Sequence, residues 1–465
     1  WRELGIFPAD FDTPAAAAVW GMDGDAGAVL AELYDACLVD YARDRWRLHD
    51  LGRDFTRALW TVEEGDALAV RHAFWYFQVL GQASELYQAG GDSVLAGLGL
   101  FDRERQNMEA GQAWAAARAG QNREIARLCN AYPAAGVHVI SLRLHPRAQI
   151  AWLEAALAAA RNLGDREAEG ANLGNLGSAY LNLGEAQKAI SYCEQALAIF
   201  HRLSNWHGEG AILGNLGSAY FSLGEIQKAI GYFEQSLAIC RETGDLRGQG
   251  NSLGRLGTAY YGLGEIQRAI GYFEQALVIH RELGDRRGEG ADLGNLGVGY
   301  ADLGEVRKAI GYYEEALKIA REIGDRRGEG NALTGLGNAH HSLGETHNAI
   351  DYYEQALVIA TETGDQSAKG ANLGNLGIAY ASLGDASNAI RYHEQALVTF
   401  RSIGNRRGEA ITSWNLGLIY EKQGDLEHAV EWMQARVDYE RATGHPEAEN
   451  YAARVEEIRR RMTGG

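Results

Sequence analysis

The segment Leu176-Gly177-Ser178-Ala179-Tyr180 decides the fold, because its pattern returns every 40 residues. The next copy reads Leu216-Gly217-Ser218-Ala219-Tyr220, and the opening leucine recurs in the later copies at Leu256, Leu296, Leu336, Leu376 and Leu416. A fixed period of this size is typical of an array in which each unit buries its apolar face against its neighbours. We therefore expect seven repeats over residues 165–444.

Each repeat reads as two helices. Apolar and small residues at helical spacing mark the first helix, at Leu173, Leu176, Gly177 and Tyr180. After Gly184, the same spacing marks a second helix, at Ala189, Ile190, Cys193, Ala196 and Leu197. Asp165 stands where the cap of the first helix is expected. Ser204, which is glycine in every later repeat, stands where a left-handed residue ends the second helix. Each repeat is therefore predicted to be a helical hairpin.

The spacing Leu-x2-Leu-Gly-x2-Tyr, followed by Ala-x3-aromatic, resembles the tetratricopeptide repeat. Its small residue matches Ala189 and the alanines that follow it every 40 residues through Ala429. Its aromatic position holds Cys193, Phe233, Phe273, Tyr313, Tyr353, His393 and Met433. Leu173 replaces the tryptophan of that motif, and its terminal proline is missing. The long repeats are similar to those of Pins-type polarity adaptors and kinesin light chain. The resemblance implies an all-α, right-handed superhelical solenoid.

Residues 1–60 do not follow the repeat. Two helices are expected at Asp12–Trp20 and Ala26–Ala36. A hairpin at Leu38–His49, with its turn at Ala42–Arg45, and a third helix capped by Asp50 are expected to follow. Helices followed by a hairpin wing and another helix indicate a small winged-helix domain in front of the solenoid.

The order Leu4-Gly5-Ile6-Phe7-Pro8, then Trp46-Arg47-Leu48-His49-Asp50-Leu51, resembles one particular winged helix. It is similar to the one that follows the nucleotide-binding module of STAND signalling ATPases of the NB-ARC class. In that family a Met-His-Asp motif closes the module, and its histidine reaches the β-phosphate of bound ADP. Leu48-His49-Asp50 matches with leucine in place of methionine. The resemblance therefore implies a nucleotide-sensing role for His49.

No Gly-x4-Gly-Lys-Ser/Thr loop occurs in the sequence, and such a loop supplies the backbone cradle and lysine of a phosphate site. We therefore expect no enzymatic activity and no cofactor in this chain. ADP or ATP is expected to bind only when a nucleotide-binding domain upstream of Trp1 is present. Such a domain is expected because Trp1 is an improbable first residue for a natural protein.

The rest of the chain is also expected to be helical. Residues 61–164 are interpreted as a helical linker with degenerate repeats, with a break at Tyr132-Pro133 and a new helix from His145-Pro146. Residues 445–465 are charged and predict a capping helix for the last repeat.

One position between the core leucines of each first helix should point toward the concave face of the solenoid. It holds Asn175, Asn215, Arg255, Asn295, Gly335, Asn375 and Asn415, which we call the groove row. Kinesin light chain resembles this, with an asparagine at the matching place that grips the backbone of an extended peptide. An amide donates and accepts at once, so the row suits a peptide backbone. The alternative is that these asparagines bridge neighbouring helices.

The residues before the groove row are glycines in most repeats, such as Gly174, Gly294 and Gly374. Glycine inside a helix costs roughly 0.5–1 kcal/mol against alanine. Its repetition indicates either close helix packing, which is the simpler explanation, or room for a partner.

Other side chains give no sign of a catalytic or metal site. Arg286-Arg287 and Arg326-Arg327 lie near glutamates and are interpreted as solvated ion pairs. His340, His341 and His347 cluster loosely, and His340 replaces a core tyrosine, so no metal is expected. The four scattered cysteines are expected to be buried thiols.

Composition narrows the partners. The net charge is −18, from 44 basic and 62 acidic residues, which argues against general nucleic-acid binding. No transmembrane run or signal peptide is recognisable, which argues against a membrane partner and places the protein in the cytoplasm.

The predicted function is the regulatory and sensor portion of a STAND signal-transduction ATPase. In this interpretation the array binds a protein or peptide and controls a nucleotide switch in the upstream domain. The alternative is a stand-alone adaptor that brings proteins together. A third interpretation, a transcription factor that uses the winged helix on DNA, is disfavoured by the acidic charge.

Overall fold

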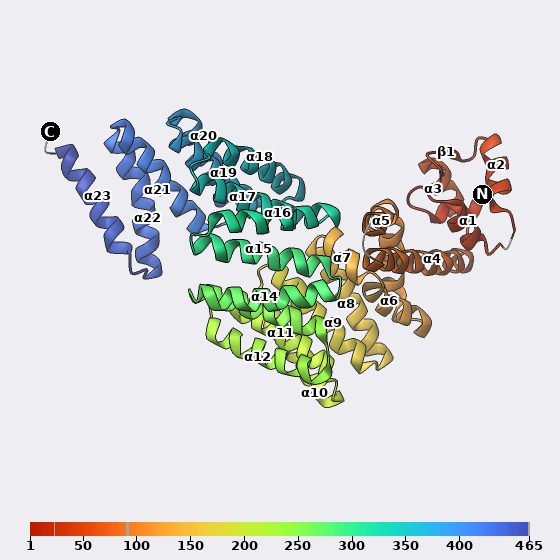
Figure 1. The fold of residues 1–465 in the computed structure, drawn as a ribbon. Helices are drawn as coiled ribbons and strands as arrows, with labels where there is room; N and C mark the ends of the chain where they lie inside the picture. The colour runs from red at the N-terminus through yellow and green to blue at the C-terminus, as the bar shows by residue number, and fades with distance from the viewer. Residues whose placement is uncertain (23, 90–92, 464–465) are drawn as a thin grey trace. The chain divides into compact units, whose positions relative to one another are not determined.

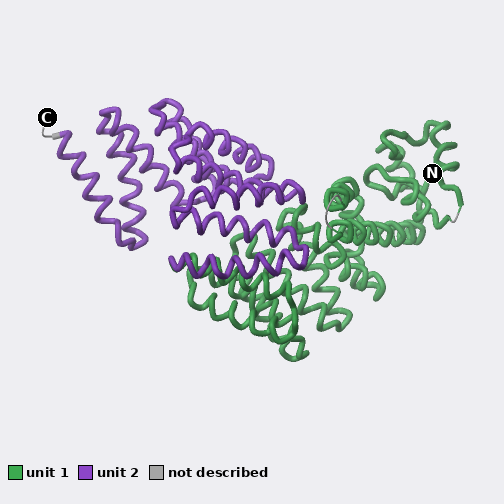
Figure 2. Tube along the Cα trace, in the orientation of Figure 1, with its two compact units in different colours: residues 1–263 green, residues 264–465 purple. Residues whose placement is uncertain are grey.

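The computed structural model describes residues 1–22, 24–89 and 93–463, which are mainly helical (Figure 1). The chain divides into two compact units, residues 1–263 and 264–465 (Figure 2). The division falls in the loop between α13 (Leu246–Gly262) and α14 (Ile266–Glu282). The predicted boundaries near residues 60, 164 and 444 remain predictions.

The predicted order of two helices, a hairpin and a third helix is confirmed in the N-terminal part. The elements are a 3-10 helix, two helices, two strands and a third helix: η1 (Arg2–Ile6), α1 (Thr13–Trp20), α2 (Ala26–Asp35), β1 (Asp40–Ala42), β2 (Arg45–Arg47) and α3 (Asp50–Ala58). The antiparallel strands are shorter than expected and pair Tyr41 with Trp46. The predicted turn at Ala42–Arg45 is confirmed, with Arg43 and Asp44 as its two central residues, at φ 53° and 62°. Such a two-residue turn with left-handed backbone matches the twist of a hairpin.

The end of the hairpin also corrects one predicted cap. Asp50 is the first residue of α3, and His49 occupies the cap position without a side-chain hydrogen bond to the helix. Asp50 still lies in the first turn, where a carboxylate is favoured by the helix dipole.

The N-terminal elements are anchored to the long helices α4 (Val62–Ala89) and α5 (Ser93–Arg118). Phe7 and Phe11 stack with ring centroids 4.1 Å apart, and Phe7 meets the edge of Tyr76 on α4. Arg45, on β2, pairs with Asp10 at 2.9 Å and with the buried carboxylate of Glu104 on α5. These hydrogen bonds raise the pKa of the Arg45 guanidinium despite its burial. Paired on both sides, the buried charge holds the hairpin on α5.

Three helices connect this part to the array: α6 (Arg123–Ala135), α7 (Val137–Arg143) and α8 (Pro146–Leu163). The predicted break at Pro133 is wrong, because α6 continues through Pro133 to Ala135. The start at Pro146 is confirmed, with His145 as cap accepting from the Arg147 N–H at 3.2 Å. Since α8 packs against both α6 and α9, it joins the linker to the array.

Residues 165–444 contain fourteen helices and no strand, as predicted. The first helices of the repeats are α9 (Arg166–Asn182), α11 (Trp206–Ser222), α13, α15 (Arg286–Asp302), α17 (Arg326–Ser342), α19 (Gln366–Ser382) and α21 (Arg406–Gln423). The second helices are α10 (Ala186–Leu203), α12 (Ile226–Thr243), α14, α16 (Val306–Glu322), α18 (Thr346–Thr363), α20 (Ala386–Ser402) and α22 (Leu426–Thr443). The predicted caps are confirmed: Asp165 accepts from the Ala168 N–H at 3.0 Å, and Ser204 has φ 51°.

The two helices of a repeat meet at the predicted small residues. The alanine of each second helix, from Ala189 through Ala429, is fully buried. The glycine after the second core leucine faces the aromatic position of the second helix. A Cβ added at Gly337 would lie 2.5 Å from the Tyr353 ring, and one added at Gly297 would lie 2.5 Å from the Tyr313 ring. Glycine is therefore required here for close packing.

Buried glutamates tie three of the repeats to the helix that precedes each of them. Glu329, on α17, is 8% exposed and accepts from Arg321 on α16 at 2.9 Å and from Arg326 at 2.5 Å. The same arrangement recurs at Glu289 and at Glu169, which accepts from Arg161 on α8. The prediction that these ion pairs are solvated is correct for the arginines, which are exposed. It is wrong for the carboxylates, which are buried.

Within each unit, successive first helices pack against one another, α9 on α11 and α11 on α13, and likewise α15 through α21. Among the described residues, successive second helices make no comparable contact. The first helices therefore form a continuous layer in each unit, which we call the first-helix layer.

The last repeat is covered by α23 (Ala448–Thr463), which packs on α22 (Figure 1). Val455 and Ile458 are buried against Met433 and Val437. Arg454 pairs with Glu421 of α21 at 2.9 Å. Polar residues on the outer side fit the expected role of a cap. No helix in the described ranges is long and apolar enough to cross a bilayer.

Two glycines on neighbouring first helices test the packing. Gly337→Ala should lower the free energy of unfolding by about 1–3 kcal/mol, because the new methyl group overlaps the Tyr353 ring. Gly374→Ala is the matched control, since no atom lies within 4 Å of the added Cβ. It should raise the free energy by about 0.5–1 kcal/mol through helix propensity. Denaturant unfolding measures both. Equal effects of the two changes would contradict the packing role of Gly337.

Candidate functional site: the groove row and its surroundings

Most members of the groove row lie at the surface of their helices, but Gly335 is buried against the Tyr313 ring. That the row lines the concave face stays a prediction. In α9 the flanking residues Leu173 and Leu176 are 1% and 0% exposed, whereas Asn175 between them is exposed. Along the first-helix layer, the amide or guanidinium members that are partly exposed are Asn215, Arg255, Asn295, Asn375 and Asn415. The pattern places these polar side chains at the surface of each unit, where a partner can reach them.

Some members of the groove row bridge neighbouring helices. Asn215 donates to the Gly174 carbonyl at 3.4 Å and accepts from Arg255 at 3.4 Å. Asn375 donates to the Asn338 side-chain oxygen at 3.3 Å. For these two asparagines the bridging alternative agrees with the geometry.

Other members have amides that are not used. Asn175, Asn295 and Asn415 make no side-chain hydrogen bond to any residue that the structure describes. A partly exposed amide without an internal partner can bind a peptide backbone through both its donor and its acceptor. The row that is uniform in sequence thus divides into bridging and available asparagines.

Arg255 is held against the first-helix layer. Its guanidinium lies over Gly214, where an added Cβ would overlap the Nη1 atom. Burial lowers the pKa of Arg255. No carboxylate of a described residue lies within ion-pair distance of it. Gly214 is therefore explained by the room that Arg255 needs.

The glycines that precede the groove row also divide into packed and open positions, although not along the same line as the asparagines. A Cβ at Gly174 would overlap Ile212, so this glycine serves close packing. At Gly294 and Gly374 no atom lies within 4 Å of an added Cβ. Open space beside Asn295 and Asn375 leaves room for a ligand backbone to approach.

His49 lies at the surface of the N-terminal part. Its Nε2 atom is 3.0 Å from the Asp40 carboxylate, and its side chain is 68% exposed. The neighbouring helix α3 also exposes large apolar side chains, with Leu51 at 86% and Phe55 at 58%. His49 therefore sits beside a helix that exposes large apolar side chains, one of which, Phe55, stacks on Trp1 with ring centroids 6.2 Å apart.

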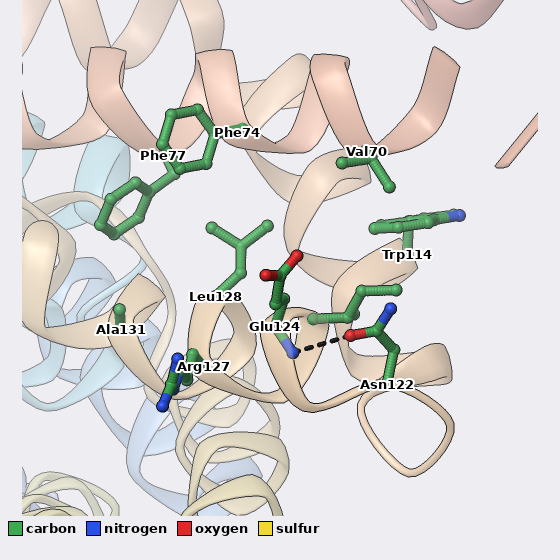
Figure 3. A pocket seen from close by; sticks show the side chains of 10 residues that line it. Val70, Phe74, Phe77, Trp114, Asn122, Glu124, Arg127, Leu128 and Ala131 are labelled. Atoms are coloured by element: carbon green, nitrogen blue, oxygen red, sulfur yellow. Dashed lines mark hydrogen bonds between the residues drawn. The ribbon is translucent and has the colours of Figure 1, made fainter. Parts of the chain in front are cut away.

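A cavity of about 390 Å³, which no sequence pattern indicates, opens between α4, α5 and α6. Figure 3 shows Val70, Phe74 and Phe77 of α4 along one side and Leu128 of α6 facing them. Glu124, whose N–H donates to Asn122 at 2.7 Å, lies between Leu128 and Trp114 in the same view. The lining is suited to apolar groups.

A second cavity of about 450 Å³ lies in the first-helix layer of the C-terminal unit, between α19, α20 and α21. Asn415 and Lys422 line it together with Ile378 and Leu418, and the buried His393 belongs to its lining. His393 occupies an aromatic position of the repeat, so its departure from the pattern was the available signal.

Among the described residues, the remaining histidines and cysteines gather into no metal-binding group. His340 stacks on Tyr352 with centroids 5.2 Å apart and pairs with Glu345 at 2.6 Å. Burial raises the pKa of the Cys193 thiol to about 12, so it stays protonated at neutral pH. The structure brings no three metal-ligating side chains together in the described ranges.

The division of the groove row predicts different effects on stability. Asn215→Ala should lower the free energy of unfolding by about 0.5–1.5 kcal/mol, because its bridge between α9 and α11 is lost. Asn295→Ala removes no internal hydrogen bond and should stay within about 0.5 kcal/mol of the unchanged protein. Thermal and denaturant unfolding measure both variants. A loss at Asn295 as large as that at Asn215 would mean that the whole row is structural.

Comparison with known proteins supports the repeat assignment. The tetratricopeptide repeat profile matches residues 169–242, 208–282, 248–322, 290–362 and 366–439, which together make up more than half of the chain. No curated protein matches the sequence.

Solved structures with similar folds include a signal transduction ATPase with numerous domains (STAND) protein with a tetratricopeptide repeat sensor from Pyrococcus horikoshii. It is 17% identical, with a TM-score of 0.60, over 98% of this chain and 64% of that chain. The chain thus spans less than two thirds of that protein's length. The quorum sensor NprR from B. thuringiensis, in its apo form, is 15% identical, with a TM-score of 0.51, over 79% of this chain and 97% of that chain. At these identities the similarity concerns the fold. By its repeat profile, the chain belongs to the tetratricopeptide repeat family.

Proposed function

We propose that this chain is the sensor portion of a STAND signal-transduction ATPase, in which the array binds a protein or extended peptide and controls an upstream nucleotide switch. The observation that carries the proposal is the similarity to the P. horikoshii STAND protein along 98% of this chain. The match includes the N-terminal hairpin region as well as the repeats. It leaves more than a third of that protein unmatched, which is room for a nucleotide-binding domain.

The surroundings of His49 support this proposal. An exposed histidine beside the exposed apolar side chains of Leu51 and Phe55 is suited to an interface with another domain. In such an interface the His49 imidazole would reach a phosphate of bound ADP, as its match to the Met-His-Asp motif implies. The chain itself would supply this contact and no phosphate-binding loop.

The available asparagines support a peptide as the trigger. Asn175 in the first unit and Asn295 and Asn415 in the second have unused amides at the surface of the first-helix layer. Peptide backbone groups that bind there keep their hydrogen bonds while leaving water. That NprR is a quorum sensor agrees with a sensing role for an array of this fold.

A route from the array to His49 runs through the linker helices. The Arg45–Glu104 pair joins β2 to α5, and α5 contacts α6 and α8, which packs on the first repeat. His49 follows β2 by two residues. A partner that favours one packing of these helices would thereby favour one position of His49.

The first test is the coding sequence before Trp1 together with one variant of the longer protein. The preceding sequence should encode a Gly-x4-Gly-Lys-Ser/Thr loop. In the longer protein, His49→Ala should speed ADP release by about tenfold or more, the effect of losing a hydrogen bond to a charged group. The exposed His347→Ala is the control. A start codon directly before this segment would favour the adaptor alternative, and an unchanged ADP release rate would remove His49 from the switch.

The second test addresses the array. A random peptide display library should yield binders of this chain whose capture is lost when Asn175, Asn295 and Asn415 are all changed to alanine. Each lost amide would leave backbone groups unsatisfied, at about 1–3 kcal/mol where the contact is dry. Asn348→Ala, an exposed amide on a second helix, is the control. Binders that ignore the triple change would show that the peptide lies elsewhere.

A further inference from the structure

The 450 Å³ cavity of the C-terminal unit holds a polar group with no internal partner. Its walls are largely apolar, formed by Ile378 and Ala381 of α19 and by Leu418 and Ile419 of α21. His393 of α20 also lines it and is 1% exposed. Neither imidazole nitrogen of His393 hydrogen-bonds to a described residue, and Nδ1 is fully buried.

A comparison with the preceding repeat explains why His393 lacks a partner. At the position 40 residues earlier, the Tyr353 hydroxyl donates to the Asn338 side-chain oxygen at 2.8 Å. The counterpart of Asn338 beside His393 is Ile378, which offers no acceptor or donor. The polar group of the second helix is thus retained, while its partner on the first helix is replaced by an apolar wall.

The charge state of His393 limits what it can bind. Burial lowers the pKa of this imidazole to about 4, so it is neutral at physiological pH. A neutral imidazole has one donor and one acceptor nitrogen and suits a hydroxyl group better than an ion. The apolar walls favour an aromatic body, since Ile378 and Leu418 are 38% and 42% exposed at the mouth. A phenol combines both features.

We infer that this cavity binds the phenol side chain of a tyrosine in the peptide that lies along the groove row. The ring packs between Ile378 and Leu418, and the hydroxyl bonds to His393. Asn415, at the same cavity, holds the peptide backbone through its unused amide. The inference rests on the proposed peptide-binding function and names the side chain that the C-terminal unit selects.

The test uses p-cresol, the isolated tyrosine side chain, and toluene, which lacks the hydroxyl. Both are titrated into the full chain while the methyl signals of Ile378 and Leu418 are followed by NMR. We expect p-cresol to bind about threefold to tenfold more tightly than toluene after correction for their different transfer from water, because of one net hydrogen bond.

Two variants distinguish the hydrogen bond to the hydroxyl group from nonspecific apolar binding. His393→Phe keeps the shape of the site, since Phe233 and Phe273 fill the same position in other repeats. It should weaken p-cresol about threefold to tenfold, leave toluene unchanged and not lower the melting temperature. Ile378→Asn restores the internal partner found beside Tyr353 and should also weaken p-cresol, even if the first variant folds poorly.

Three outcomes would overturn the inference. They are no shift of the cavity methyl signals with p-cresol, equal p-cresol affinity in the unchanged chain and both variants, or toluene bound as tightly as p-cresol. None of these measurements requires a nucleotide or the upstream domain. Failure of the STAND proposal would therefore leave the result interpretable, and failure here would leave that proposal standing.

Discussion

The contact between a glycine of each first helix and the aromatic position of the following second helix is the constraint on which the array depends. At Gly337 there is no room for a methyl group beside the Tyr353 ring, and Gly297 is related to Tyr313 in the same way. This approach sets how the two helices of a repeat pack. This contact recurs with the 40-residue period. The groove-row residue of each repeat therefore occupies the same position on its first helix. The space beside Gly374 can stay unfilled because the contact between the glycine and the aromatic position already packs the two helices.

Much of the array could be predicted from the sequence, because its determinants are local and repeated. The caps at Asp165 and Ser204 and the helix boundaries follow from neighbouring residues, so the structure confirms them. The division of the groove row could not be predicted. Asn215 and Gly174 are 41 residues apart in sequence, and whether they form a hydrogen bond depends on the distance between their two helices. The lack of a partner for His393 could have been predicted, because the 40-residue period alone shows that Ile378 replaces Asn338.

The N-terminal part was harder to predict for the same reason. The hairpin was recognised from its β-rich stretches, but its turn depends on left-handed backbone at Arg43 and Asp44, which do not favour it strongly. The bond between Arg45 and Glu104 joins residues 59 positions apart, and no local pattern indicates it. Pro133 lies within α6, where the packing around Tyr132 overrides the helix-breaking tendency. Contacts distant in sequence therefore decide how this region carries His49.

The series of buried glutamates between repeats is not uniform, and this affects how stability is distributed along the array. Glu289 and Glu329 each connect an arginine of the preceding second helix to their own first helix. At the matching position of the next repeat stands Lys369, which forms no ion pair with a described residue. In a repeat protein, stability is approximately a sum of nearest-neighbour interfaces. The junction between α18 and α19 therefore lacks one of the electrostatic ties of its neighbours. Separation of the array at this junction, before the repeats that carry His393, therefore breaks one such ion pair fewer than separation at α14–α15 or α16–α17.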